Sequence, residues 1–431
     1  MEINKNKTFE PILNQFIIFA IFISILGFIS DLANTFEFGG IDLRNRVVGA
    51  RLLMNGLDPY FFKWNENMSE LFLDPNDSPY SPVSKVTVPP TVLIVHSALA
   101  KIPYKTQRII WFLFQWILFL VSLALFSKST HSENKSKLIW IIGLLFISGS
   151  FFWRLHVEKG QIYILYVFLI AFAYWLSQKN FKNSSILSGF VIGFTASLRP
   201  PMIFMSIPML IYRKWKLFIG NIIGFLFGIG SSLMIADSFL WKKYASAMYI
   251  HEKIHLGLIT DIFGLYSKLD AEGMNNILLW ANIPTFDSSF QGIFKRFLGL
   301  NLSSNMLLIS LTLILLFLSF YLYKSCRENN SMTMLFLAGA TLVFISEFFI
   351  PAARQSYSDV MWLIPLSLII INCDSLSLLL LNPLTTLLFI GLIFSISFHL
   401  MPCSGLISDY AMLFYITFTT LLFLNRRFSW Q

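Results

Sequence analysis

The residues with the strongest potential for chemistry lie in one short stretch, 39–60. This stretch combines the carboxylate of Asp42 with the guanidinium groups of Arg44 and Arg51. Carboxylates can exchange protons with a substrate, and guanidinium groups bind anions through paired hydrogen bonds. Aspartate is also among the preferred helix N-caps, so Asp42 has a purely structural interpretation as well. Spacing alone leaves both interpretations open.

Local signals predict the element that carries these residues. With Asp42 as the N-cap and Gly56 after the last turn, residues 43–55 are expected to form a helix. Val48 and Leu52 lie on an apolar side, and the two arginines, seven positions apart, share a polar side. We therefore expect an amphipathic helix that lies in the membrane interface with its apolar side towards lipid.

Three further polar segments lie between apolar runs and could bind a polar or anionic ligand. They contribute Arg154, His156, Lys159 and Gln161, then Arg199 before Pro200, and finally Arg354 and Tyr357. Each has a plainer interpretation, as a solvated loop residue, an arginine that snorkels to the interface, or part of a simple turn.

Metal and disulfide chemistry is not expected. His251 and His255 have the spacing of a metal-binding pair on a helix, but Glu252 is the only carboxylate near them. The three cysteines, Cys326, Cys373 and Cys403, are far apart and show no CxxC spacing.

Composition identifies the solvent around these residues. Of the 431 residues, 56% are hydrophobic and only 13% are charged, against roughly 25% charged in soluble domains. Such a chain cannot cover its apolar surface with a charged exterior, which excludes a soluble fold. The net charge of +9 resides in short clusters between apolar runs, so nucleic acid is not an expected partner. We predict an all-α, multi-pass membrane protein.

Twelve apolar runs are candidate membrane spans. Several, notably 200–212 and 360–373, are shorter than the ~20 residues that cross a bilayer core. Only two long polar interruptions occur, at 31–108 and 237–300, so residues 1–431 are expected to form one membrane domain with two large loops. The runs are 11–30, 109–127, 138–153, 160–178, 183–198, 200–212, 217–236, 301–323, 331–346, 360–373, 379–400 and 410–424.

The positive-inside rule predicts the orientation. Basic residues in short loops such as 128–137, 179–182 and 213–216 fall on one side, which we assign to the cytoplasm. The two large loops are then external. This threading requires 87–100 to return to the outer surface without crossing; the alternative is that 87–100 crosses and 183–212 is one broken helix. With either threading, we expect the protein to lie in the cytoplasmic membrane.

Several short motifs follow one another in order. They are Asp42, Arg51, Gly56, Asp58, Pro59 and Tyr60, then Pro89-Pro90 and Pro103, then Gly160-Gln161, Gly189 and Gly193, and Arg199-Pro200. This series, over roughly residues 31–216, resembles glycosyltransferase family 87, the polyprenol-phosphate-mannose-dependent mannosyltransferase-like proteins of the GT-C superfamily.

The resemblance implies a GT-C-type bundle of about twelve transmembrane helices with jaw helices 43–55 and 90–100 on the external, periplasmic side. It implies that a sugar moves, with inversion, from a polyprenyl-phosphate donor to a hydroxyl group of a glycan or glycolipid acceptor, without a cofactor. The catalytic base then falls on Asp42, with Asp31 at the end of the first span as the alternative. Where the family often has aromatic residues after the aspartate, this chain has Arg46 and Val47, so mannose, another hexose and a pentose stay open.

The resemblance also suggests substrate contacts. Arg199, Arg154 and Lys159 would hold the donor phosphate, and Arg44, Arg51, His156, Gln161, Arg354 and Tyr357 would contact substrate elsewhere. Membrane lipids complete the expected partners.

Other functional classes fit the sequence less well. No cytosolic domain is present that could hold a nucleotide sugar, and the spans contain almost no ionisable residue of the kind that ion-coupled transporters need. An O-antigen ligase or polymerase usually has its large polar loop late in the chain, whereas the longer loop here follows the first span. A lipid-linked sugar transporter and a ligase or polymerase remain the alternatives.

Overall fold

The computed structural model describes residues 5–37, 39–62, 67–73, 86–235, 238–256, 258, 287–325, 331–373, 382–396 and 403–425. Every regular element within these residues is helical, so the expected all-α fold is confirmed. Residues 259–286 of the second large loop lie outside the described residues.

Among the residues that the structure describes, six helices are long and apolar enough to cross a membrane. They are α1 (Lys5–Glu37, apolar from Glu10), α4 (Tyr104–Ser127), α10 (Trp215–Ile235), α15 (Ser304–Ser325), α16 (Met332–Phe349) and α20 (Ser404–Leu424). A seventh crossing exists if α5 (Glu133–Ile141), its π-helical continuation Ile142–Ile147 and α6 (Phe151–Glu158) count as one span, bent by 69° at residues 148–150.

The remaining predicted spans are apolar helices of 10–17 residues. They are α7 (Tyr163–Ser177), α8 (Ser184–Leu198), the 3-10 helix Pro200–Met205 with α9 (Ser206–Ile211), the 3-10 helix Ser356–Trp362 with α17 (Leu363–Asn372), and α19 (Thr385–Ile396). Each apolar run is thus helical, but by length only six or seven of the expected twelve cross within the described residues, because the others stop short of the ~20 residues that a bilayer core requires.

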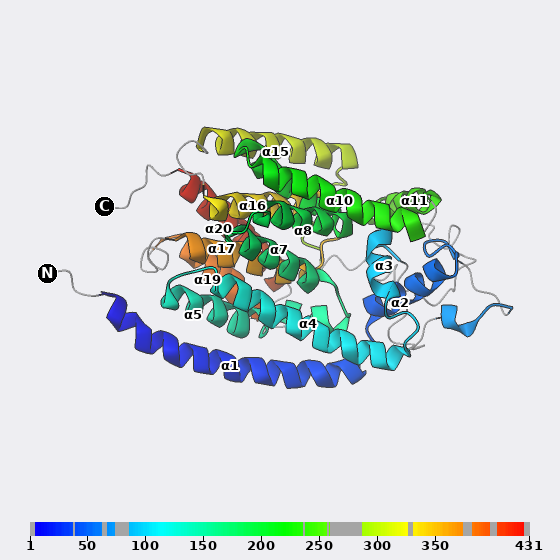
Figure 1. The fold of residues 1–431 in the computed structure, drawn as a ribbon, viewed down its shortest axis with the longest axis horizontal. Helices are drawn as coiled ribbons and strands as arrows, with labels where there is room; N and C mark the ends of the chain where they lie inside the picture. Colours follow the sequence, from blue (N-terminus) through cyan, green and yellow to red (C-terminus); the bar gives the residue numbers. More distant parts are fainter. Residues whose placement is uncertain are drawn as a thin grey trace.

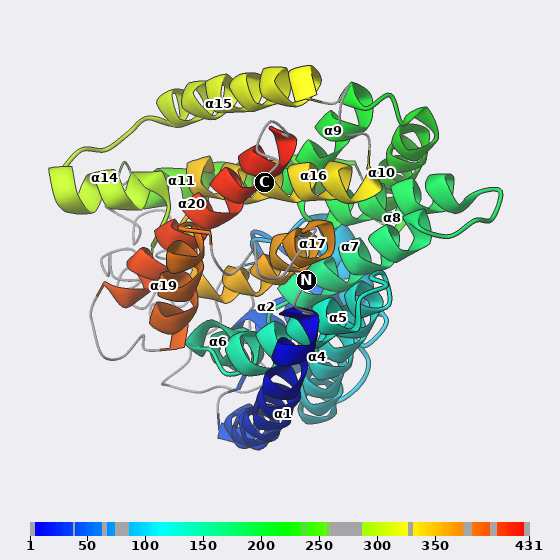
Figure 2. The same cartoon turned by 90° about the vertical axis from the view of Figure 1, so that its left-hand side faces the viewer.

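The bundle has two distinct ends (Figure 1). Both termini lie at one end, whereas α2 (Ile41–Met54), α3 (Pro90–Ser97) and α11 (Phe239–His255) gather at the other. We call the second end the loop end. In the perpendicular view, α15 stands off from the bundle across α16 (Figure 2).

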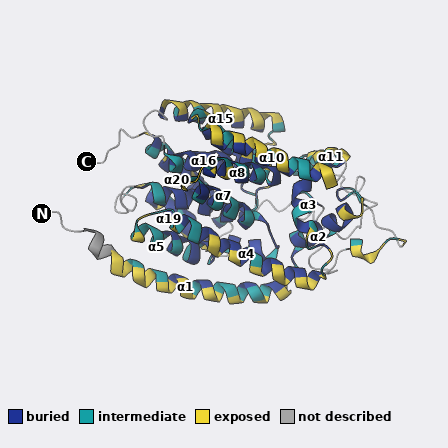
Figure 3. Ribbon diagram, in the orientation of Figure 1, coloured by how far each residue is buried: buried dark blue, intermediate teal, exposed yellow. Residues whose placement is uncertain are grey.

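The outermost helices present apolar side chains outwards (Figure 3). Ile18 of α1 is 68% exposed, Leu226 of α10 60% and Phe320 of α15 69%. A soluble protein would not leave so large an apolar surface in water. These faces are suited to lipid, and the chain is a multi-pass membrane protein.

Glycines set the closest helix contact of the bundle. A Cβ atom added to Gly193 of α8 would lie 1.8 Å from the backbone oxygen of Asn221, and one added to Gly224 of α10 would lie 1.9 Å from that of Phe190. Only glycine allows the two backbones to approach this closely. Gly220, Gly224 and Gly228 of α10 thus serve helix packing, whereas a Cβ atom added to Gly230 would meet nothing within 4 Å.

The structure corrects the prediction for the helix after Asp42. The N-cap of α2 is Gly40, in a left-handed conformation with φ 70°, and Asp42 lies in the first turn of the helix. Most of α2 is buried, including Arg44 and Arg51. The helix α3 and the chain around it cover the polar side of α2. The helix α2 therefore does not lie in the membrane interface with its polar side in water.

Candidate active site

Asp42 is joined to the turn between α6 and α7. The backbone N–H groups of Asp42 and Leu43 both donate to the carbonyl of Lys159, at 3.1 Å. The Gln161 side-chain amide donates to Asp42 Oδ2 at 2.5 Å. A Cβ atom on Gly160, whose φ is 68°, would lie 2.7 Å from Leu43 Cβ, so the close approach requires this glycine.

Gln161 connects Asp42 to a buried arginine that was not among the predicted site residues. Arg46 Nη1 donates to Gln161 Oε1 at 3.3 Å, and Nη2 donates to the Gly160 carbonyl. Burial lowers the pKa of the Arg46 guanidinium, and the Asp42 carboxylate opposes this shift. Arg46 follows Asp42 by four positions and so shares its side of the helix, which was the signal available in the sequence.

Cationic and aromatic side chains form a series from Lys159 to Arg199. Lys159 Nζ lies 5.1 Å from the ring centre of Tyr357, which lies 5.6 Å from that of Tyr163. The guanidinium carbon of Arg199 lies 4.4 Å from the Tyr163 ring centre. Burial lowers the pKa of the Lys159 ammonium group, again opposed by Asp42. Lys159, Tyr163, Arg199 and Tyr357 are all half-buried.

At the end of this series, Arg199 forms an ion pair with the carboxylate of Glu347. Its Nε and Nη2 atoms both donate to Glu347 Oε1, at 3.1 and 2.5 Å. Glu347 is 4% exposed, and its Oε2 has no hydrogen-bond partner among the described residues. Arg199 is therefore held by an ion pair and does not snorkel. One side of the guanidinium faces Glu347, while 17% of the side chain stays exposed.

These contacts define one site at the loop end. Asp42, Arg46 and Arg199 all lie within electrostatic range of Tyr357, and Tyr244 of α11 lies within range of Arg199. We call the group the cation–aromatic site: Asp42, Arg46, Lys159, Gln161, Tyr163, Arg199, Glu347 and Tyr357. Its formal charges, three positive and two negative, leave one net positive charge.

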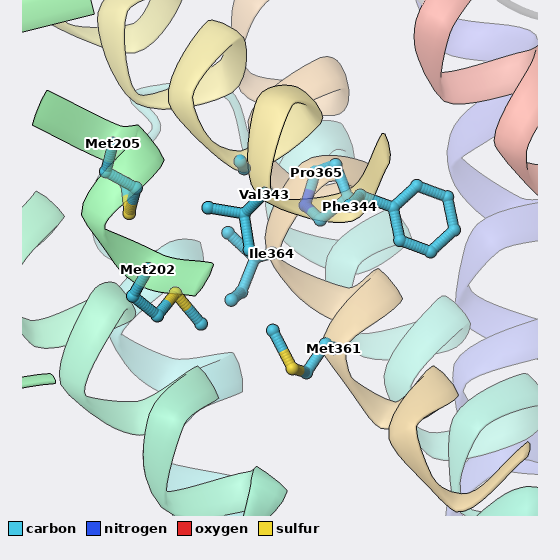
Figure 4. Close-up of a pocket in the computed structure, with 8 residues that line it drawn as sticks. Met202, Met205, Val343, Phe344, Met361, Ile364 and Pro365 are labelled. Atoms are coloured by element: carbon cyan, nitrogen blue, oxygen red, sulfur yellow. The ribbon is translucent and has the colours of Figure 1, made fainter. Parts of the chain in front are cut away.

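Figure 4 shows a small apolar cavity within the bundle. Met202 and Met205, on the 3-10 helix that follows Arg199, line it together with Val343 and Phe344 of α16. Met361 lines it from the segment that also carries Tyr357. The cavity thus shares its three walls with the elements that position Arg199, Glu347 and Tyr357.

Comparison with known proteins assigns the family. The model of glycosyltransferase family 87 matches residues 87–346, more than half of the chain. The chain belongs to glycosyltransferase family 87. It is therefore a membrane glycosyltransferase. Neither the curated proteins nor the solved structures contain a significant match to this chain.

The family match covers only part of the cation–aromatic site. Lys159, Gln161, Tyr163 and Arg199 lie inside the matched residues, whereas Asp42 precedes them. Of the resemblance noted over roughly 31–216, the first motif, Asp42 to Tyr60, thus lies outside the match, and the role of Asp42 in this family 87 chain stays a prediction.

Asp31, the alternative base, lies elsewhere. It is 2% exposed in α1, and its Oδ2 accepts a 2.9 Å hydrogen bond from the indole of Trp153. Its carboxylate is enclosed by side chains of the bundle, whereas Asp42 is half-buried beside the cations.

Several predicted substrate contacts have structural roles or lie apart. Arg51 donates to the carbonyls of Ala100 and Leu71, at 3.0 and 3.2 Å, and so connects α2 to two other segments of the first loop. His156 is fully buried, and its Nε2 accepts the backbone N–H of Ile164 at 3.2 Å. These two side chains are engaged by the protein itself.

Arg44, Arg154 and Arg354 also do not join the site. Arg44 is completely buried within α2, and Arg154 lies exposed on α6. Arg354 is 5% exposed and donates to Asp409 and Asp359, at 2.6 and 2.5 Å. Of the predicted residues, the structure therefore brings together Asp42, Lys159, Gln161, Arg199 and Tyr357.

Three members of the site were missed from the sequence. Arg46 was seen only as a departure from the family pattern, and Tyr163 and Glu347 were not considered. Glu347 is a lone acid at the end of an apolar run, and ionisable residues in such positions are usually functional or paired. That signal could have identified it. No group of three or more potential metal ligands occurs among the described residues.

Proposed function

We propose that this protein transfers a sugar, mannose or a related hexose, from a polyprenyl-phosphate donor to a hydroxyl group of a glycan or glycolipid on the outer face of the cytoplasmic membrane. The observation that carries the proposal is the meeting of one half-buried carboxylate with three cations at the end of a membrane bundle. Together these groups supply what such a transfer needs.

Asp42 serves as the general base. Its Oδ2 accepts from Gln161 at 2.5 Å, which fixes the orientation of the carboxylate. The carboxylate takes the proton of the acceptor hydroxyl as the hydroxyl oxygen bonds to the anomeric carbon. The bond from that carbon to the phosphate oxygen breaks, and the polyprenyl phosphate leaves with the electron pair. Attack from the face opposite the phosphate inverts the anomeric centre without a covalent enzyme intermediate.

Arg199 and Lys159 bind the departing phosphate. Arg199 is held by Glu347 through one edge and by the Tyr163 face, so it is oriented before the donor arrives. Preorganised cations stabilise the charge that develops on a leaving phosphate. The net charge of +1 in the site complements a phosphodiester, which carries one negative charge, better than a pyrophosphate linkage, which carries two.

The position of the site in a bundle of membrane-spanning helices favours a lipid-linked sugar over a soluble one. Tyr163 and Tyr357 offer ring faces between the two cations. Such faces suit the apolar side of a sugar ring.

The test is turnover by purified protein. Wild-type protein in lipid nanodiscs is supplied with a polyprenyl-phosphate mannose donor or with GDP-mannose, together with lipid extract from cells that lack the protein. Mass spectrometry then identifies sugar-bearing products. We expect product only from the lipid-linked donor, and none from Asp42→Asn protein. Product from GDP-mannose in a polyprenol-free extract would contradict the proposal.

A further inference from the structure

The helix α14 (Phe290–Leu298) is buried at its N-terminal end and exposed at its C-terminal end. Gln291 and Gly292 in the first turn are buried, whereas Phe297 and Leu298 in the last turn are 61% and 60% exposed. A surface helix in water turns its apolar side inwards. The exposed apolar side chains of the last turn are therefore suited to an apolar medium.

Contacts to the spanning helices fix the level at which α14 lies. The ring of Phe290 lies 4.4 Å from that of Phe349, the last residue of α16, and 5.8 Å from that of Tyr410 near the start of α20. Gln291 Oε1 accepts the backbone N–H of Leu302 at 2.8 Å, two residues before α15. Three candidate spans end around α14, so the helix lies at the boundary between hydrocarbon and headgroups.

Basic residues accompany the exposed apolar ones. Lys295 is exposed, and the guanidinium of Arg296 is held near the ring of Phe297, 5.6 Å from its centre, and near Cys403 Sγ at 3.7 Å. Leu300, just past the helix, is 53% exposed. Apolar groups that can enter the acyl region thus adjoin cations at headgroup level. In Figure 2, α14 projects sideways from the bundle beside α20.

We propose that α14 is an interfacial anchor that binds an anionic phospholipid. Phe297, Leu298 and Leu300 insert among the acyl chains. Lys295 and Arg296 contact the lipid phosphate, whose negative charge is not balanced by a cationic headgroup. The occupant is a membrane lipid because three spans fix the helix at headgroup depth and its charge is complementary to that lipid. This inference does not depend on the identity of the donor or acceptor.

Photo-crosslinking tests the insertion. The photoreactive residue p-benzoylphenylalanine replaces Phe297 in the full-length protein in membranes, and adducts are identified by mass spectrometry. Leu71, which is 61% exposed in the 3-10 helix Glu70–Phe72 of the first loop, is the matched control. We expect phospholipid adducts at 297 and none at 71. Crosslinking of position 297 to protein, to a second copy or to nothing would overturn the proposal.

Lipid retention tests the preference for negative charge. Detergent-solubilised protein is mixed with equal amounts of phosphatidylglycerol and phosphatidylcholine, and native mass spectrometry counts the bound lipids. Lys295→Gln is expected to lower the ratio of phosphatidylglycerol to phosphatidylcholine about five-fold, the effect of one cation at an anionic surface. Lys242→Gln, at an exposed lysine of α11, should leave the ratio unchanged. Equal retention of both lipids by wild type, or equal ratios in the two variants, would overturn it.

Discussion

Two arginines at the loop end, Arg199 and Arg354, meet their carboxylates in opposite ways. Arg354 Nη1 donates to Asp409 at 2.6 Å and to Ser288 at 2.8 Å, and Nη2 donates to Asp359 at 2.5 Å. Arg199 meets a single oxygen of Glu347 and keeps 17% of its side chain exposed. One guanidinium is enclosed and neutralised, and the other stays partly open.

This difference in enclosure distinguishes Arg354, which stabilises the fold through an ion pair, from Arg199, which can bind a ligand. Burial alone would lower the pKa of Arg354, but Asp409 and Asp359 offset it and hold the pKa above its ordinary value. A ligand phosphate could reach Arg354 only by displacing two carboxylates. Arg199 is stacked on Tyr163 and needs no such displacement. Both arginines looked alike in the sequence, as cations in polar turns between apolar runs.

The largest expected effect tests whether the cation–aromatic site is the catalytic site. Asp42→Asn should lower turnover about 10²- to 10⁴-fold, because the acceptor hydroxyl loses its base, with membrane insertion unchanged. Asp409→Asn in the enclosed cluster should lower thermal stability while turnover per folded molecule stays near wild type. Initial rates and thermal unfolding of the purified proteins measure both. Loss of turnover in Asp31→Asn with normal turnover in Asp42→Asn would move the base to Asp31.

The next effect tests the enclosed cluster. Arg354→Gln leaves Asp359 and Asp409 buried without their cation, so the free energy of unfolding should fall by about 3–5 kcal/mol. Adding Asp359→Asn and Asp409→Asn to the same protein should restore part of this loss, because no buried charge is then uncompensated. Thermal denaturation in detergent is the readout. A stable Arg354→Gln protein with weakened donor binding would reverse the roles of the two arginines.

A smaller effect is expected at Arg199. Arg199→Gln combined with Glu347→Gln removes both charges together, so thermal stability should stay close to that of wild type. Loss of a charged hydrogen bond to the phosphate, worth about 1.5–3 kcal/mol, should raise the KM for the lipid donor about ten-fold or more. Steady-state kinetics with varied donor concentration measure this change. An unchanged KM would remove Arg199 from the phosphate site.

The smallest effect concerns Arg51, which sequence reasoning placed with the substrate. Arg51→Lys loses the fork that reaches both Ala100 and Leu71, and should cost about 1 kcal/mol locally. Hydrogen exchange should rise around residues 98–102 and 67–73, with turnover within a few-fold of wild type. A large rise in KM without a change in exchange would instead support a substrate contact.

Elements were easier to predict than sites. Apolar runs located the apolar helices of the bundle, and the prolines at 89–90 marked the start of α3, because both signals act on neighbouring residues. The helices α11 and α14 lie in the segment that was expected to be a polar loop. The burial of α2 was not predictable, since the cover comes from residues 86–100 and from the turn at Lys159. The N-cap role of Asp42 was also wrong, because Gly40 supplies the left-handed turn.

The sequence by itself determined the solvent and the helical class, because composition and hydropathy are summed over many residues and tolerate local error. It also indicated the family, through a series of short motifs in a fixed order. Only the tertiary structure decided which polar residues work together. Gln161 bridges Asp42 to Arg46 over more than 110 positions, and Glu347 reaches Arg199 over 148. Such pairs form because burying a charge is favourable only beside its partner, and no local pattern in the chain records that proximity.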